Sequence, residues 1–406
     1  MTPALSLNPR QAPALPPQPF FARPEQRTGL ARERFFEQGL RPTGLVGEAV
    51  IQSWARCVGA QRRPGEAVAF DPVTRARLRA TLARNQTLLS AASADIASLE
   101  AALSGTAVRV ILTDGDGVVV HASALPGNAD RVLPVVGRVG VDLGEATSGT
   151  NALAVVAKTG SAITVLGAEH FFDCIRMLSC AAAPIHDQRG QLAGVLDLTV
   201  ESRAFGFDAA ALVGVYATAI ENRLLQSVAQ EQLVLQFQAC PTLLGSPLAA
   251  LAGVGSDGRI AWTNGSARQL LGLSRAGVAA LDAEALFGTP LAELLSVTLN
   301  PAARAVRLPN GLTVWLRAQL QADDGAHRLT PVALAPAAPV VAPMPAPTPA
   351  PAAATESPAT LGQHTRSVIE ASLAEHQGNI SRTARSLGVS RGLLYRRLRD
   401  WAGECR

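Results

Sequence analysis

The spacing of hydrophobic and polar positions changes along the chain, and each change predicts a different kind of structure. From about residue 29 to 103 the apolar side chains recur with a helical period. One helix should contain Ser53-Trp-Ala-Arg-Cys57, and a second should open at Asp71-Pro72, with Asp71 as N-cap and Pro72 at the first position. A third is predicted over about 86–103. This region is therefore expected to be helical.

Runs of β-branched residues follow the helical region. Strands are predicted at 107–113, 118–122, 162–166, 180–185 and 192–200. The first two flank Asp-Gly-Asp-Gly, which favours a hairpin, and Asp187–Gly190 should form the turn between the last two. Helices are predicted at 149–158 and 208–236. The spacing of apolar residues in the long second helix favours a helix that faces the core, and a dimerising signalling helix is the alternative. An α+β sheet with helices against one face is expected.

A second mixed unit is predicted to start near residue 240. Hairpins are expected at 256–264 and 306–316, and a helix should begin at Ser266. After about 323 the chain becomes an Ala/Pro linker, which is extended and semi-rigid. A compact helical block follows at 362–402.

Composition removes one class of enzyme. Of the 36 basic side chains only Lys158 is a lysine, and it lies in Val-Val-Ala-Lys-Thr-Gly. A Walker-A loop needs a lysine after a glycine-rich run in order to hold phosphates. A P-loop ATPase is therefore excluded, and neither a Gly-x-Ser-x-Gly elbow nor a His-Glu-x-x-His pair indicates another enzyme.

The net charge of +4 is unevenly distributed. Residues 1–90 carry +7, residues 91–359 carry −7, and the last 47 residues carry 8 Arg against 4 acids. A basic end on an acidic body favours a nucleic-acid contact, and a solvated charged helix is the alternative. The five cysteines are scattered and odd in number, so we expect no disulfide framework and a reducing cytoplasm. No signal peptide or membrane helix is predicted, because prolines interrupt the apolar stretch at 331–354.

The C-terminal block has the pattern of a helix-turn-helix. A first helix at 364–376 is followed by Gly378-Asn379, which should end it and cap a second helix, Ile380–Leu387. Gly388 supplies the tight turn. A third helix, Arg391–Trp401, places arginines on its outer face, as a recognition helix in the major groove requires.

The segment Gly378–Leu398 resembles the Fis-type helix-turn-helix, through Gly-Asn, Ala384, Leu387-Gly-Val-Ser-Arg391 and Leu394-Tyr-Arg-Arg-Leu398. The resemblance implies that Arg391 reads a base edge, with guanine as the expected partner. It also implies that Asn379 caps a helix facing phosphate. The other residues expected to face DNA are Ser390, Tyr395, Arg396, Arg397 and Arg399.

The middle of the chain resembles the GAF module of acetoin-catabolism-type, sigma-54-dependent regulators. The motifs that carry this resemblance are Ser53–Cys57, Leu112–Val119, Gly149–Leu153, Glu169–Phe171, Leu178–Ile185 and Gly194–Leu198. The 240–320 unit is similar to a shortened PAS domain, through Gly258–Asn264 and Leu270–Gly272. Both resemblances imply cupped sheets that bind small molecules.

The predicted fold class is thus α+β multidomain. The predicted domains are a disordered Pro-rich arm at 1–28, an N-terminal helical region at 29–104, a GAF sensor with its exit helix at 105–236, a PAS-like unit at 237–322, an Ala/Pro linker at 323–360 and a Fis-type block at 361–406.

The residues expected to anchor a ligand in the GAF pocket are Asn151, Glu169, His170 and Asp197. Each has a structural alternative, as a helix cap, a loop pair or a satisfied strand residue. The cysteines and histidines of the same region, His170, Cys174, Cys180 and His186, lack the paired spacing of zinc ligands, so neither metal nor cofactor is expected.

Regulators of this kind carry an ATPase between sensor and DNA-binding block, where this chain has the Ala/Pro linker. The absence of this ATPase argues against direct activation of sigma-54 polymerase by this chain. The sequence therefore predicts a cytoplasmic, ligand-responsive, homodimeric DNA-binding regulator, with double-stranded DNA, a small-molecule effector and RNA polymerase or an ATPase-bearing paralogue as partners. The alternatives are a sensory adaptor that dimerises with such a paralogue and, more remotely, a GAF-type cysteine reductase.

Overall fold

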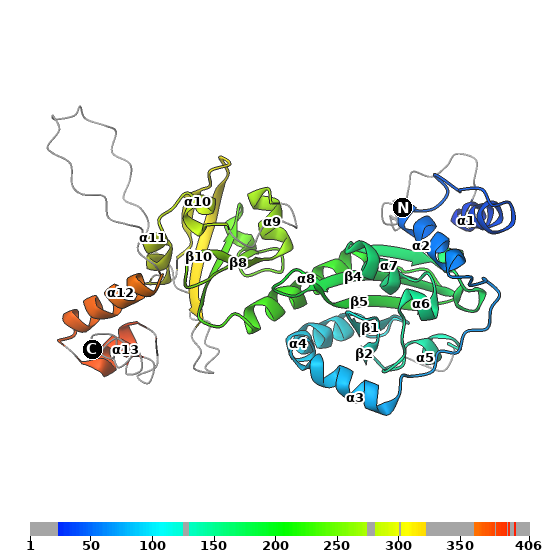
Figure 1. Ribbon diagram of the computed structural model, residues 1–406, viewed down its shortest axis with the longest axis horizontal. Coiled ribbons are helices and arrows are strands. Elements are labelled where there is room, and N and C mark those ends of the chain that lie inside the picture. The colour runs from blue at the N-terminus through cyan, green and yellow to red at the C-terminus, as the bar shows by residue number, and fades with distance from the viewer. Residues whose placement is uncertain are drawn as a thin grey trace, which may run out of the picture. The chain divides into compact units, whose positions relative to one another are not determined.

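The computed structural model describes residues 23–124, 130–273, 281–299, 302–321, 361–377, 379–387, 389 and 394. The chain divides into two compact units, Met1–Ser227 and Val228–Arg406, which are described separately below (Figure 1). Among the described residues, no helix has both the length and the apolar character needed to cross a bilayer.

The first unit opens with the predicted helical region. Its elements are α1 (Pro24–Arg32), a π-helical turn (Glu33–Glu37), α2 (Glu48–Gly59), α3 (Arg75–Arg84) and α4 (Gln86–Ala102). The predicted disordered arm at 1–28 is wrong for its last residues. Pro24 lies in the first turn of α1, where a missing N–H leaves no helical hydrogen bond unmade. Thr28 and Ala31 of this helix are buried.

The helix expected to open at Asp71-Pro72 starts later. Pro72 pairs with Val141 in an isolated β-bridge, and Val73 donates its N–H to the Gly140 carbonyl at 2.8 Å. This pairing keeps the backbone extended, so α3 begins only at Arg75. Thr74 is its N-cap, because the Thr74 hydroxyl accepts the Arg77 N–H at 3.3 Å.

The predicted strands form one antiparallel sheet in the order β2-β1-β5-β4-β3. Their bounds are β1 Arg109–Asp114, β2 Val119–Ala122, β3 Ile163–Leu166, β4 Leu178–His186 and β5 Leu192–Glu201. The predicted hairpin at 107–122 and the turn at Asp187–Gly190 are both confirmed.

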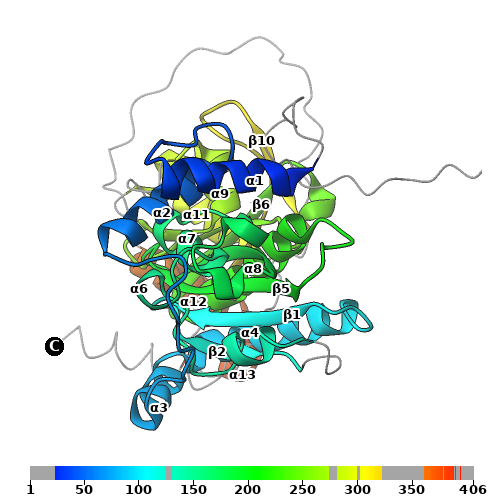
Figure 2. The same ribbon diagram turned by 90° about the vertical axis from the view of Figure 1, so that its right-hand side faces the viewer.

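Helices cover both faces of this sheet, not one face as predicted. One face packs against α4 and α8 (Ala209–Ser227) through Leu196 and Leu198, whereas Val195 and Cys180 belong to the core on the other face. Figure 2 shows the helices around this sheet. The helices on that second face include α2, α5 (Leu133–Val136) and α7 (Ala152–Thr159), and Ser148 of α6 (Glu145–Ser148) lines a cavity on the same side. Most residues of β4 and β5 are buried on both faces, so both faces need a cover.

The predicted exit helix at 208–236 is wrong beyond Ser227. Residues Gln232–Gln238 form β6, the central strand of the second unit's sheet. The sequence Gln-Leu-Val-Leu-Gln-Phe-Gln places Leu233, Leu235 and Phe237 on one buried face, a period of two rather than of a helix. Glu231, with a φ of 51°, separates the two elements.

The second unit contains a five-stranded antiparallel sheet in the region of the predicted PAS-like unit, in the order β8-β7-β6-β10-β9. Its further strands are β7 Ala250–Val254, β8 Ile260–Thr263, β9 Arg304–Arg307 and β10 Thr313–Gln321, and its helices are α9 Gly265–Leu271, α10 Ala283–Phe287 and α11 Leu291–Ser296. The predicted tip at Asn310-Gly311 is confirmed, with Gly311 at a φ of 88°. Asn264 is the N-cap of α9 and accepts the Ala267 N–H at 2.8 Å.

The C-terminal block begins with α12 (Leu361–Glu375) and α13 (Ile380–Ser386). Ile369 of α12 and Ala384 of α13 share a small core with Leu394. The small Ala384 side chain lets the two helices approach closely, as the sequence predicts. The rest of the predicted third helix lies outside the described residues.

Candidate functional site

A buried polar cluster lies on the α7 side of the first sheet. Cys180 of β4 is paired in register with Thr199 of β5, and Asp197 lies two residues along β5 on the same face. Because side chains alternate along a strand, Asp197 and Thr199 point away from α4 and α8. The three side chains thus converge at the centre of the sheet.

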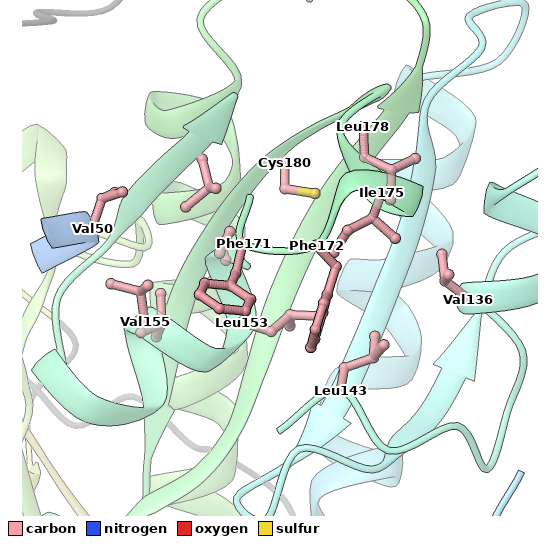
Figure 3. Close-up of a cluster of buried hydrophobic side chains, with 14 of the residues drawn as sticks. Val50, Val136, Leu143, Leu153, Val155, Phe171, Phe172, Ile175, Leu178 and Cys180 are labelled. Carbon is pink, nitrogen blue, oxygen red and sulfur yellow. The ribbon is translucent and has the colours of Figure 1, made fainter. Parts of the chain in front are cut away.

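These residues line a cavity of about 30 Å³. Its polar wall consists of Ser148, Asn151, His170, Cys180, Asp197 and Thr199. Its apolar wall includes Ile111, Leu143, Leu153, Ile175 and Leu178, and Figure 3 shows the Cys180 sulfur among several of these side chains. The volume suffices for one or two water molecules.

Asp197 is the least satisfied member of the cluster. Its side chain is fully buried, and one carboxylate oxygen accepts a short hydrogen bond from the Thr199 hydroxyl. The other oxygen, Oδ1, has no hydrogen-bond partner among the described residues. Burial raises the pKa of Asp197 to about 7. A ligand hydroxyl would satisfy this oxygen in both protonation states, because it can donate to a carboxylate and accept from a carboxylic acid.

His170 is held in one tautomer. Its Nδ1 lies 2.9 Å from the Gly167 carbonyl, which can only accept, so Nδ1 carries the proton. The unprotonated Nε2 then faces the Cys180 thiol at 3.5 Å. Burial lowers the pKa of His170 to about 4, which keeps the ring neutral.

Asn151 has the helix-cap role that the sequence leaves open as the alternative to ligand contact. Its Oδ1 accepts the Ala154 N–H at 2.9 Å and caps α7, while its amide donates to the Leu143 and Gly149 carbonyls and to the Ser148 hydroxyl. It also lines the cavity. With these contacts made, Asn151 shapes the wall and has little hydrogen-bonding capacity left for a ligand.

Glu169 does not line the cavity, so the structure separates it from the other three predicted ligand residues. Its carboxylate turns back to accept the Leu166 N–H at 2.9 Å, and burial raises its pKa to about 7. This is the loop role that the sequence leaves open as an alternative.

Thr199 and Ser148 also line the pocket, although neither is predicted from the sequence, and Cys180 is predicted only as a metal or redox candidate. Thr199 lies two residues after Asp197 on β5, so it faces the same side of the sheet, and this spacing could have identified it. Cys180 could have been identified because it lies in the neighbouring strand β4 and pairs with Thr199. Within the described ranges, no three side chains of His, Cys, Asp or Glu lie close enough to hold a metal ion.

At the C-terminal block, the predicted cap is confirmed. Asn379 Oδ1 accepts the Arg382 N–H at 3.2 Å at the start of α13, and Arg382 and Arg385 of that helix are exposed. The remaining residues expected to contact DNA, Ser390, Arg391, Tyr395, Arg396, Arg397 and Arg399, lie outside the described residues.

Comparison with known proteins identifies both regions. Residues 25–222 match the MimR N-terminal domain, and residues 365–401 match the Fis family of bacterial regulatory proteins. The chain joins a MimR-type sensor domain to a Fis-family helix-turn-helix. It fits a sigma-54-type regulator that lacks the central ATPase domain, as the sequence predicts.

Several curated relatives are transcriptional regulators. The acetoin catabolism regulatory protein of Cupriavidus necator is 29% identical over 55% of this chain and 34% of its own length. The propane 2-monooxygenase operon transcriptional activator MimR of Mycolicibacterium goodii is 30% identical over 43% of this chain and 29% of its own. The chain thus spans about a third of the length of these relatives.

Among solved structures, the Escherichia coli DhaR(N)–DhaL complex contains a similar chain. It is 14% identical, with a TM-score of 0.42, over 68% of this chain and 99% of that one.

Proposed function

We propose that this protein is a cytoplasmic, ligand-responsive transcription regulator. It senses a small molecule in the cavity beside Asp197 and binds DNA sequence-specifically through the Fis-type block, as a homodimer and without ATPase activity. The observation that carries this proposal is the buried Asp197 oxygen, which lacks a described partner and faces a cavity, on a chain that also has a Fis-family helix-turn-helix.

The pocket favours a small, uncharged effector. None of its described lining residues is Arg or Lys, so a carboxylate or phosphate would find no counter-charge there. A cavity of about 30 Å³ is far below the roughly 300–1,000 Å³ of a drug-sized site. Asp197 Oδ1 has no described hydrogen-bond partner, and a hydroxyl group of the effector could supply one. Two relatives are named as regulators of acetoin catabolism and of glycerol metabolism, and both compounds are small, uncharged and hydroxylated.

The output is proposed to be DNA binding. Arg391 would read a base edge, and Ser390, Tyr395, Arg396, Arg397 and Arg399 would contact phosphates or flanking bases. Effector binding would change the orientation of α8 (Ala209–Ser227), which leads out of the first unit, and with it the pairing of two DNA-binding blocks.

A panel of small hydroxylated compounds tests the sensing step. Isothermal titration with the full chain should give saturable binding to the parent protein, and Asp197→Ala should abolish it. Asp187→Ala is a matched control, because it removes an acid from the turn between β4 and β5. Binding that survives Asp197→Ala would contradict the assignment of the pocket.

The linker position favours a second candidate, a sensory adaptor. The chain has its Ala/Pro stretch where its relatives' ATPase is expected, so it could dimerise with an ATPase-bearing paralogue. Copurification of such a paralogue, together with no DNA binding by the isolated protein, would support this candidate instead. A cysteine reductase has no comparable support, since burial raises the pKa of the Cys180 thiol well above its ordinary value.

A further inference from the structure

The two loops that carry polar pocket residues are both held by the N-terminal helices. One loop, 143–151, includes the single turn of α6 and contributes Ser148 and Asn151 to the cavity, and the other, 167–173, contributes His170. Neither α1 nor α2 supplies a residue to the cavity lining, yet side chains of both helices bind these loops from outside. The motif Ser53–Cys57 on α2 is part of this contact and has no other assigned role.

Arg32 at the end of α1 binds the second loop. Its guanidinium donates to the backbone carbonyls of Ala168 at 3.1 Å, His170 at 2.6 Å and Phe171 at 3.2 Å, and to the Asp173 carboxylate at 3.1 Å. The residue is only 6% exposed. Burial lowers the pKa of Arg32 to about 10, so it stays charged at neutral pH.

Residues of α2 bind the first loop. Ser53 is fully buried and donates to the Glu145 carboxylate, so the neighbouring Thr150 hydroxyl, at 2.7 Å, donates to Ser53. Arg56 makes two parallel hydrogen bonds to Glu145, of 2.6 and 2.7 Å. Such bidentate pairs fix geometry as well as adding energy.

One further contact joins α2 to the second loop, because the Trp54 indole N–H donates to the Glu169 carbonyl at 2.8 Å. The loops are also linked to each other, through the Phe171 N–H and the Thr150 carbonyl at 3.2 Å. Displacement of α1 and α2 would therefore release both loops together.

A solute has to pass one of these walls to reach the cavity. His170, Cys180, Asp197 and Thr199 are each at most 6% exposed, so the polar wall of the cavity is shielded from solvent. The sheet, backed by α4 and α8, closes one side and forms a continuous hydrophobic core. The other side is closed by the two loops, which pack on buried apolar side chains of α2 such as Trp54 and are also held by the polar contacts described above. A polar group released from such a contact can hydrogen-bond to water instead, whereas an apolar side chain released from a core cannot.

We propose that α1 and α2, residues 24–59, form the gate of the pocket, and that Arg32, Ser53 and Arg56 are positioning residues that latch it closed on loops 143–151 and 167–173. This inference rests on the proposed sensing function. When the latch opens, the Arg32 guanidinium regains water in place of four protein acceptors. The pocket is then accessible, and ligand binding and latch closure become linked equilibria.

The Cys180 thiol reports opening without any effector. In the full chain with Cys174, Cys240 and Cys405 replaced by serine, we measure the rate of N-ethylmaleimide labelling at Cys180 by peptide mass spectrometry. Arg32→Gln should accelerate labelling by at least about tenfold, since a hydrogen bond to a charged group contributes enough for that factor. Ser53→Ala, which removes one hydroxyl, should also accelerate labelling of Cys180. This variant is the substitute test if Arg32→Gln fails to fold.

Two comparisons make the test specific. Arg223→Gln breaks an ion pair to Asp95 on the opposite face of the sheet, at 2.6 Å, and should leave Cys180 labelling unchanged. Hydrogen exchange should rise in 24–59, 143–151 and 167–173 of Arg32→Gln, with α8 unchanged. Unchanged labelling in both latch variants, or exchange that rises equally in α8, would overturn the gate. Because the probe is a thiol reagent, these outcomes are independent of whether an effector is found.

Discussion

Replacing Asp197 by Asn should change the pH dependence of stability in a direction that the structure fixes. An aspartate in an unfolded chain titrates near 3.9, whereas Asp197 in the folded protein titrates near 7. Between these two values the unfolded state loses its proton while the folded state keeps it. Stability from this group is therefore complete below about pH 4 and is lost as the pH rises.

The magnitude follows from the same two values. Each pH unit within this window costs about 1.4 kcal/mol, so the parent protein should lose on the order of 3 kcal/mol between pH 5 and 8 through Asp197 alone. Asn cannot titrate but keeps an acceptor for the Thr199 hydroxyl. The free energy of unfolding of Asp197→Asn, relative to the parent, should thus rise by on the order of 3 kcal/mol from pH 5 to 8.

Urea unfolding at several pH values measures this difference. Other titrating groups, including His170 and Glu169, are present in both proteins and cancel. Asp187→Asn, in the turn between β4 and β5, controls for the general loss of one acidic charge. A difference that stays flat from pH 5 to 8, or falls, would refute the desolvated carboxylate on which the pocket argument depends.

Three further outcomes are expected. Gly149→Ala should cost on the order of 2–4 kcal/mol in urea unfolding, because Gly149 has a φ of 63° and a ψ of −156° and a Cβ there would lie 2.8 Å from the Phe172 ring; an unchanged midpoint would exclude this strain. Asn151→Ala should cost about 2 kcal/mol through the lost cap and donors, and Asn151→Asp, which keeps the capping oxygen, should cost less by the same assay. Replacing Arg396 and Arg397 by Gln should flatten the slope of log K against log salt by about 0.9 per lost phosphate contact, and an unaltered slope would show that neither contacts DNA.

The periodic pattern of the chain predicts most of the individual elements, because local spacing determines them. Hairpins at Asp-Gly and Asn-Gly, the Asn379 cap and the helix at 86–102 all follow from residues within one turn of each other. The predicted exit helix extends past Ser227 because Val228 and Leu235 continue the helical spacing of α8, although Val228 lies outside any strand and Leu235 lies in β6. Only the partner strands in the second unit decide between helix and strand.

The pocket depends on contacts that local spacing does not encode. Asp197 meets His170 and Cys180 only because β5 pairs with β4 and the 167–173 loop folds over them. Arg32 binds residues between Ala168 and Asp173, which lie about 140 positions further along the chain. A buried arginine in the first helix therefore looks in the sequence like any other surface charge.

The central claim, sequence-specific DNA binding by the C-terminal block, is tested most directly by selection of bound duplexes from a random DNA library. The full chain should enrich one motif with two related half-sites, as a dimer requires. Arg391→Ala should retain salt-dependent binding but lose the enrichment, since it removes a base contact and leaves the phosphate contacts. No enriched motif with the parent protein, or the same motif with Arg391→Ala, would contradict the account.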